Sequence, residues 1–252
     1  MMQKQLLSFF LMTISALLLV CCGVKNTSSS KVKTDFKSYY YPVESLIIPK
    51  VYHFSVDDEK TGDLYWVLST VTENNKTYLL TDSYAMDTLD NLNHVEVIKE
   101  EINKKGAFVK EYIETQRNQI GQKFKSPAVM ESEGVFLWDL KETEDITWKF
   151  KNESKVYPDY DVETYRKRKF TGESLTIEFE GKITPAIIFS DEFRVIYINR
   201  LNNQRNDIGF TQTSYYAKGI GLYKYTRVFP ERKVTFTLKE ILSLEEWEKM
   251  KQ

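Results

Sequence analysis

The feature of this sequence that most constrains its fold is a period-two alternation of apolar and polar side chains, repeated in segments that short turns separate. Such alternation is typical of β-strands with one buried face. Successive strands joined by only a few residues must pair antiparallel, because a parallel connection needs a dozen or more. The segments with this pattern lie at residues 64–71, 78–84, 135–140, 146–151, 175–179, 187–189, 195–198 and 234–238.

The alternation predicts a mainly β fold, a curved antiparallel meander of about nine to eleven strands shaped as a half-barrel or a sandwich. Residues 94–118 also fit helical spacing, but Gly106 favours a hairpin tip there, so hairpin and helix both stay open. Residues 243–246 read Ser-Leu-Glu-Glu, which is a capping box. We therefore expect a short C-terminal helix whose Trp247 covers the sheet.

The N-terminus has the pattern of a bacterial lipoprotein signal. Lys4 precedes an apolar run that ends at Cys21-Cys22-Gly23, and this run is too short to span a membrane. Cleavage before Cys22 places the small Cys21 side chain before the cut, whereas cleavage before Cys21 would place β-branched Val20 there. The sequence therefore predicts that Cys22 is lipidated, with Cys21 as the alternative.

Three parts follow from these patterns: a signal peptide with the lipidated Cys over residues 1–22, a flexible tether rich in Ser and Lys over 23–38, and a single β-rich domain over 39–252. Several acyl chains such as palmitate anchor a protein lastingly to a membrane. We expect a lipid-anchored protein of the bacterial cell envelope. Gly23 in place of Asp after the lipidated Cys favours the outer membrane, and the leaflet stays open.

The charge balance argues against nucleic acid as a partner. Lys and Arg number 35 and Asp and Glu number 36, so the net charge of −1 attracts no polyanion. The one basic run is Arg166-Lys167-Arg168-Lys169. We interpret it as a solvated strand or loop, with contact to lipid headgroups or an acidic polysaccharide as the alternative.

Patterns of catalytic and metal-binding residues are weak. His53 and His94 have no partner at metal-ligand spacing, and a Gly-x-Ser-x-Gly elbow is absent from the sequence. Asp159 and Asp161 share one strand face without further ligands. We expect no enzymatic activity, no metal and no cofactor, although a cleft that paired either histidine with acids would favour an enzyme.

The most distinctive internal string runs Tyr-Tyr-Ala-Lys-Gly-Ile-Gly-Leu over residues 215–222 and is followed by an alternating strand. It resembles the C-terminal hairpin of TapB-like bacterial lipoproteins of unknown function. The similarity is good over residues 170–240 and faint over 60–140. It implies a curved antiparallel sheet on an exported lipoprotein and no catalytic residues.

Two glycines and the strand after them are the candidate site. Gly219 and Gly221 allow the positive φ or the bulge that a turn into a new strand needs. Tyr223, Tyr225 and Arg227 share one strand face, which could stack on a flat ligand such as a sugar or be covered by a loop or helix. We expect a binding or assembly-support module that contacts an envelope protein or a glycan without catalysis. The alternative is a carrier or chaperone of a lipidic ligand in a groove of the curved sheet.

Overall fold

Strands make up most of the chain from Lys50 onward. The computed structural model describes residues 34–251 except 59, 88–90, 119, 142–143, 155 and 157–158, so the signal peptide, Cys21, Cys22 and residues 23–33 lie outside the described residues. The elements are the 3₁₀ helices η1 (Phe36–Tyr39) and η2 (Val43–Ile47), the strands β1 (Lys50–Val56), β2 (Leu64–Glu73), β3 (Lys76–Met86), β4 (Leu92–Ile102), β5 (Gly106–Arg117), β6 (Lys123–Pro127), β7 (Val129–Leu137), β8 (Asp145–Glu153), β9 (Tyr160–Phe179), β10 (Lys182–Asn199), β11 (Arg205–Ala217), β12 (Gly221–Val228) and β13 (Lys233–Ser243), and the helix α1 (Leu244–Met250).

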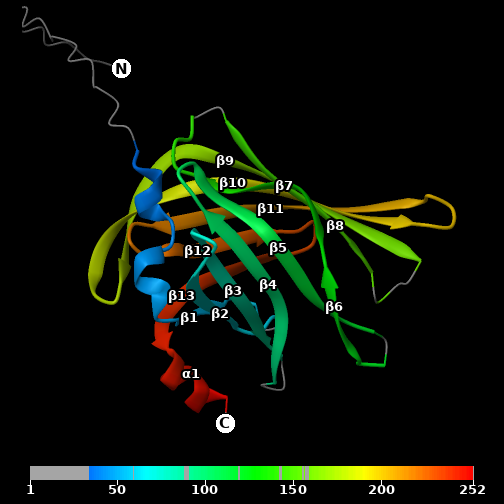
Figure 1. The fold of residues 1–252 in the computed structure, drawn as a ribbon, viewed down its shortest axis with the longest axis horizontal. Coiled ribbons are helices and arrows are strands. Elements are labelled where there is room, and N and C mark those ends of the chain that lie inside the picture. Colours follow the sequence, from blue (N-terminus) through cyan, green and yellow to red (C-terminus); the bar gives the residue numbers. More distant parts are fainter. Residues whose placement is uncertain are drawn as a thin grey trace, which may run out of the picture. The chain divides into compact units, whose positions relative to one another are not determined.

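The strands form a closed antiparallel barrel in which neighbours in the chain are neighbours in the sheet, except that β6 and β7 both pair with β5 (Figure 1). β6 and β7 lie end to end along the same edge of β5, so the 13 strands occupy twelve positions around the barrel. The first strand pairs with the last, from Lys50 opposite Ser243 to Val56 opposite Phe236. The predicted antiparallel meander is confirmed. The expectation of a half-barrel or sandwich is wrong, because the β1–β13 and β4–β5 pairings close the sheet into a ring.

Residues 94–118 form the hairpin of β4 and β5, which decides between the two alternatives for this region. At Gly106 a Cβ would lie 2.2 Å from the carbonyl oxygen of Phe136, so the close approach of β7 requires a glycine. The β2–β3 turn is built by Asn74 and Asn75, whose φ angles of 51° and 61° suit a tight hairpin turn. Residues 195–198 are not a separate strand, because they continue β10 along β9.

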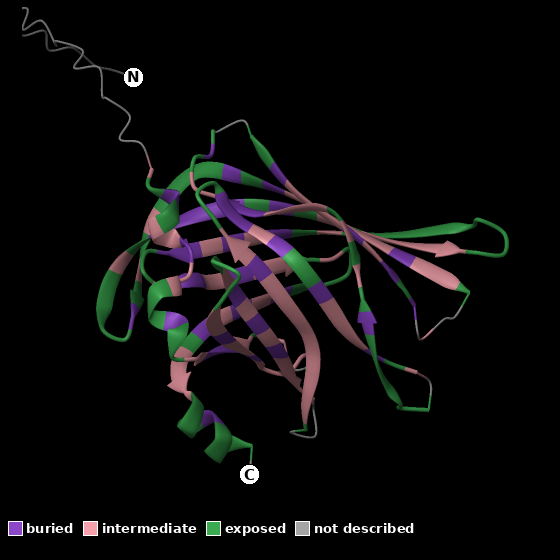
Figure 2. Cartoon of the chain, in the orientation of Figure 1, coloured by how far each residue is buried: buried purple, intermediate pink, exposed green. Residues whose placement is uncertain are grey.

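Inward-facing side chains form rows that cross neighbouring strands, and buried and exposed positions alternate along the ribbons (Figure 2). One row consists of Phe170, Phe189, Ser214, Tyr225 and Phe236, each directly opposite the next. All five are buried. The ring centroids of Tyr225 and Phe236 are 4.6 Å apart and nearly parallel. Aromatic packing of this kind fills one part of the barrel.

Residues 35–47 pack against one end of this interior, and we call them the N-terminal plug. Phe36 is buried and its ring lies 5.0 Å from that of Phe170, edge to face. Leu46 is buried as well. The folded part therefore begins before residue 39, within the segment expected to be tether, because Phe36 buries its ring in the barrel core.

The C-terminal helix α1 begins with the predicted capping box. The Ser243 hydroxyl accepts a hydrogen bond from the Glu246 amide, and the Glu246 carboxylate accepts one from the Ser243 amide. Trp247 is buried against the outer side of the barrel, where its ring lies 4.9 Å from that of Tyr65. In the described part of the chain, no helix has the length and apolar character that crossing a membrane requires.

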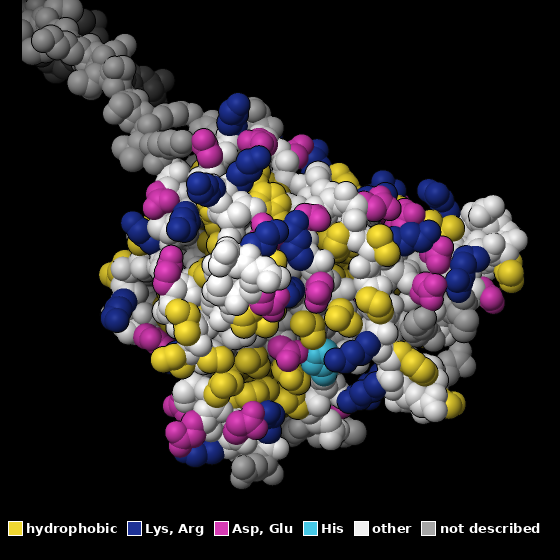
Figure 3. Space-filling view, viewed as in Figure 1, with side chains coloured by type: hydrophobic (Ala, Val, Ile, Leu, Met, Phe, Trp, Pro, Cys, Tyr) yellow, Lys and Arg dark blue, Asp and Glu magenta, His cyan; other side chains and the backbone are white. Residues whose placement is uncertain are grey.

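Charged side chains of both signs are dispersed over the face that Figure 3 shows, and hydrophobic side chains gather beside the C-terminal helix. The visible face therefore has no large area of one charge that would attract a polyanion.

Candidate functional site

A cavity of about 570 Å³ lies inside the barrel. Tyr40 and Tyr41 of the plug bound one end, and Ser154 and Val156, which follow β8, bound the other. Its volume is within the range of small-molecule sites, which run from roughly 300 to 1,000 Å³. Much of its lining is aromatic, from Trp66, Tyr112, Trp148, Phe150, Phe193 and Phe210.

Half of the basic run faces this interior. Strand alternation turns Arg166 and Arg168 inward, where both are buried, and turns Lys167 outward to pair with Asp145 at 3.0 Å. The interpretation of the run as a solvated strand is therefore wrong for its two arginines. The signal that could have placed them is their spacing from Phe170, which lies on the same face of β9.

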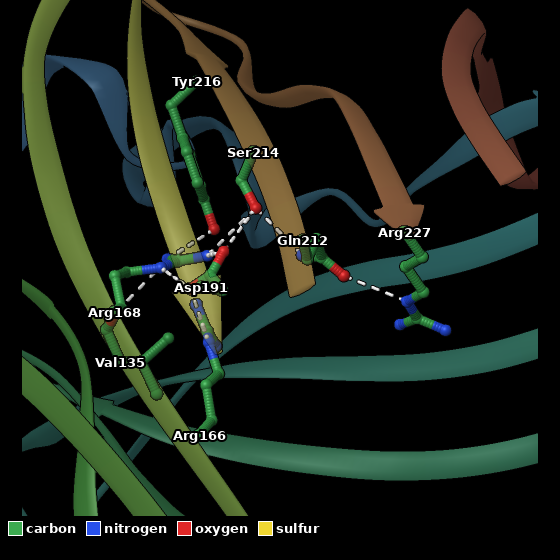
Figure 4. A network of polar contacts seen from close by, with 8 residues as sticks. All are labelled: Val135, Arg166, Arg168, Asp191, Gln212, Ser214, Tyr216 and Arg227. Carbon is green, nitrogen blue, oxygen red and sulfur yellow. Dashed lines mark hydrogen bonds and ion pairs between the residues drawn. The ribbon is translucent and has the colours of Figure 1, made fainter. Parts of the chain in front are cut away.

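Asp191 holds the two arginines together (Figure 4). Its Oδ1 accepts hydrogen bonds from Nε of Arg166 at 2.9 Å and from Nε of Arg168 at 2.6 Å, and its Oδ2 accepts one from the Ser214 hydroxyl at 2.7 Å. Burial by itself would raise the pKa of Asp191, but the two guanidinium groups outweigh it and hold that pKa well below its ordinary value. Asp191 is therefore a carboxylate at neutral pH.

A polar row continues from these residues across four strands. Arg168, Asp191, Gln212 and Arg227 lie directly opposite one another on β9, β10, β11 and β12. Nε of Arg227 donates to Oε1 of Gln212 at 2.9 Å. In Figure 4 the other nitrogens of Arg227 point away from the network. We call Arg166, Arg168 and Arg227 the basic wall of the cavity.

An acidic wall faces the cavity from β4 and β5. Glu96 and Glu114 are direct partners in the β4–β5 register, and Glu100 follows Ile98 on the same face of β4. The hydroxyl of Tyr112 donates to Glu96 at 2.7 Å, and the hydroxyl of Tyr40 donates to Glu100. Burial raises the pKa of both Glu96 and Glu100, and these two hydrogen bonds oppose the rise.

Four polar atoms on the cavity lining are buried without a hydrogen-bond partner among the described residues. They are Oγ of Ser83, Nε1 of Trp148, Oδ1 of Asn152 and Nη2 of Arg166. An unpaired buried polar group costs about 1–3 kcal/mol. Their concentration on one cavity indicates a place where a polar molecule can complete the hydrogen bonds.

Two of the three residues expected on a ligand-contact face lie at this interior. Arg227 lines the cavity, and Tyr225 is buried beside it with its ring centroid 5.1 Å from the Arg227 guanidinium. A β-bulge opposite Tyr215 and Tyr216 shifts the register at residues 222–224. Tyr223 is displaced from the other two and its ring contacts Phe179, 6.2 Å away between centroids.

Gly219 and Gly221 form the turn that meets the N-terminal plug. Their φ angles are +74° and +97°, and the amide of Gly219 donates to the carbonyl of Ser38 at 2.8 Å. A Cβ on Gly221 would lie 2.4 Å from Cδ1 of Tyr41, whereas one on Gly219 would meet no atom within 4 Å. The turn therefore holds Tyr41 in place at the plug end of the cavity.

Both histidines have hydrogen-bond partners that include acids. The ring of His53 lies between Asp63 at 2.7 Å and Glu240 at 2.8 Å and is buried. Neither His53 nor its partners line the cavity. A histidine paired with acids is the arrangement that would favour an enzyme, but here it lies apart from the interior site.

The second histidine is arranged in a similar way. Nε2 of His94 lies 2.6 Å from Asp82, and Nδ1 lies 2.5 Å from the Thr115 hydroxyl, in a row across β3, β4 and β5.

Of the two aspartates considered as metal ligands, Asp161 is paired with Lys151 at 3.0 Å. Within residues that the structure describes, no group of three or more His, Cys, Asp or Glu side chains is placed to hold a metal ion.

Comparison with known proteins gives weak likenesses. No protein-family model and no curated protein matches the chain. A candidate lipoprotein from Parabacteroides distasonis ATCC 8503 has a TM-score of 0.47 and 10% identity over 81% of this chain and 97% of that chain. A candidate exported protein with a YmcC-like fold from Bacteroides fragilis NCTC 9343 has a TM-score of 0.42 and 9% identity over 77% of this chain and 93% of that chain. The resemblance to TapB-like lipoproteins stays a prediction from the sequence.

Proposed function

We propose that this protein is a lipid-anchored binding protein of the bacterial envelope that holds a small ligand inside its barrel without transforming it. The observation that supports this proposal is the cavity of about 570 Å³ with unpaired polar atoms on its lining. A barrel of about eight strands is narrow enough for side chains to fill. The twelve positions of this barrel enclose more space, and charged side chains project into it.

The charged lining favours a polar ligand over the lipidic ligand of the alternative hypothesis. An acyl chain laid against Arg166, Arg227 and Glu114 would take water away from these charged groups and offer them no hydrogen bond in return, which is costly. The aromatic side chains of the lining would still cover an apolar part of a polar molecule. The carrier or chaperone of a purely lipidic ligand is therefore the weaker proposal.

Anchoring and location are proposed from the N-terminal pattern alone. Acylation of Cys22 would attach the barrel to a membrane, with the outer membrane favoured by Gly23. An envelope protein or a glycan stays a proposed partner for the outer surface. The binding function proposed for the interior does not depend on which of these partners is present.

Native mass spectrometry of the full-length protein, extracted in mild detergent from its own envelope, tests the binding function. We expect an added mass that denaturation releases. Val195 lines the cavity, so Val195→Trp should fill it and abolish the adduct, while Arg194→Trp on the exposed side of the same strand should retain it. Absence of any adduct, together with no thermal stabilisation by a small-molecule library, would contradict the proposal.

A further inference from the structure

We propose that the ligand is a small zwitterion, with its cationic group between Glu96 and Glu114 and its anionic group against Arg166 and Arg227. This inference rests on the proposed binding function and adds the chemical class of the ligand. Four observations carry it: the neighbouring carboxylates, the unpaired oxygens beside them, the unpaired guanidinium nitrogen of Arg166 on the basic wall, and the aromatic side chains of the lining.

The acidic end is built from two carboxylates that face each other. Glu96 and Glu114 are direct cross-strand partners, and like charges in that position destabilise a sheet. Their hydrogen bonds come from neutral groups: Tyr112 donates to Glu96 at 2.7 Å, and the amides of Gln116 and Asn152 donate to Glu114 at 2.8 and 3.0 Å. In the part of the chain described, neither carboxylate forms an ion pair with Lys or Arg. A bound cation would relieve their repulsion.

Unpaired acceptors beside these carboxylates point to the same kind of ligand. Oδ1 of Asn152 has no partner and the residue is 4% exposed, and its amide nitrogen already holds Glu114. Oγ of Ser83 also lacks a partner, the residue is 3% exposed, and it lies directly opposite Glu96 on β3. Two carboxylates and two free oxygens suit a group with several N–H donors, such as a primary ammonium.

At the basic end, hydrogen-bond donors lack acceptors. Nη2 of Arg166 lacks a partner although the residue is only 9% exposed. Asp191 cannot neutralise this side alone, because its carboxylate is shared with Arg168. Arg227 uses its Nε on the neutral Gln212. The remaining guanidinium N–H groups are suited to a carboxylate or a phosphate, which accept charge-assisted hydrogen bonds.

Aromatic side chains line the cavity beside the basic end, where the guanidinium carbon of Arg166 lies 5.6 Å from the ring centroid of Phe193. Phe193 and Phe210 stack with centroids 4.7 Å apart and planes 7° apart, and both line the cavity with Trp148. Glu96 and Arg227 line the same cavity, so one small molecule can contact both ends. A ligand with an apolar body and opposite charges at its two ends matches all of these groups.

Isothermal titration of the full-length protein in detergent tests this inference, with 6-aminohexanoate and its shorter homologues as the zwitterions. Three probes of similar length serve as comparisons: hexanoate carries only the negative charge, hexylamine only the positive charge, and 1,6-diaminohexane two positive charges. We expect the best zwitterion to bind at least about tenfold more tightly than each of these three, since each lacks one charge-assisted contact. Glu114→Gln should reduce its affinity to that of hexanoate, and Arg227→Gln should reduce it to that of hexylamine.

Glu111→Gln, on the exposed side of β5, is the matched control and should leave the dissociation constant unchanged. Glu96→Gln is the second variant if Glu114→Gln fails to fold, as judged by circular dichroism. Equal or tighter binding of hexanoate, hexylamine or the diamine would overturn the zwitterion inference. No binding of any probe would overturn it as well. A native adduct seen by mass spectrometry would leave the proposed binding function standing in either case. Failure of all these probes together with no adduct and no thermal stabilisation by a small-molecule library would remove both.

Discussion

Arg168 and Asp191 face each other directly across β9 and β10, with Nε of the arginine 2.6 Å from Oδ1 of the aspartate and both side chains almost entirely excluded from solvent. Asp191→Asn would leave Arg166 and Arg168 buried without their counter-charge. Removing one partner from a buried ion pair costs about 3–5 kcal/mol. Urea unfolding should show a loss of that size.

The matched control is Asp207→Asn, because Asp207 pairs with Arg194 at the surface. Exposed ion pairs contribute about 0–1 kcal/mol. Equal destabilisation by the two substitutions would contradict the idea that Asp191 organises the interior.

Stability should fall as pH rises from acid toward neutrality through the titration of Glu96 and Glu100. Burial raises the pKa of both carboxyl groups in the folded protein, so the fold binds these protons more tightly than the unfolded chain does. Their stabilising contribution is complete below the ordinary carboxyl pKa of about 4.3 and is lost as the pH passes the raised values. Asp191 acts in the opposite direction, but its lowered pKa confines that effect to more acid solution.

The double variant Glu96→Gln/Glu100→Gln should therefore gain stability relative to the wild type as the pH rises from about 4.5 to 7. Urea midpoints across this range measure the difference. Glu101→Gln is the control on the same strand, since Glu101 pairs with Lys76 at the surface. If the urea midpoints of the double variant and the wild type changed in parallel with pH, this account would be refuted.

Gly221 and Gly219 should differ in their tolerance of a side chain. Gly221→Ala would bring its Cβ to 2.4 Å from the ring of Tyr41 at a φ of +97°, whereas Gly219→Ala meets only the cost of its φ of +74°. That conformational cost is about 1–2 kcal/mol. We expect the first substitution to destabilise by clearly more than the second in thermal unfolding.

Tyr41→Ala supplies the control, because it removes the ring that the new Cβ would meet. In a double-mutant cycle the pair Gly221→Ala and Tyr41→Ala should show a coupling of about 0.5–3 kcal/mol, while Gly219→Ala should be additive with Tyr41→Ala. Additivity in both cycles would mean that backbone conformation alone requires Gly221.

Features that depend on neighbouring residues could be predicted from the sequence. The β2–β3 hairpin follows from the alternation of residues 64–71 and 78–84, and the start of α1 follows from Ser243 and Glu246. At β4–β5 the sequence leaves a helix open, and Gly106 only favours the hairpin. Closure of the barrel could not be predicted in this way, because it joins Val51 to Leu242 from opposite ends of the domain. An alternating pattern tells which face of a strand is buried but not whether the outermost strands meet.

The cavity was harder to predict for the same physical reason. Arg166 and Arg168 belong to a run that is typical of a charged surface. Only their two-residue spacing from the buried Phe170, which places all three on one face of β9, indicates that they turn inward. Glu96 and Glu100 likewise alternate in phase with Ile98 on β4 and line the cavity with it. Opposite charges from β4 and β9 come together only through the closed sheet, which local patterns do not encode.

Membrane attachment depends in our proposal on Cys22, which lies outside the described residues. The described fold begins near Asp35, so the intervening 12 residues could extend roughly 40 Å from the bilayer. Cys22→Ala should abolish incorporation of labelled palmitate and move the protein from the membrane to the soluble fraction, because in our proposal the lipid is attached to this thiol. Cys21→Ala should keep both acylation and membrane attachment, since alanine is small enough to precede the cut. Acylation that persists in Cys22→Ala and disappears in Cys21→Ala would place the lipid on Cys21 instead.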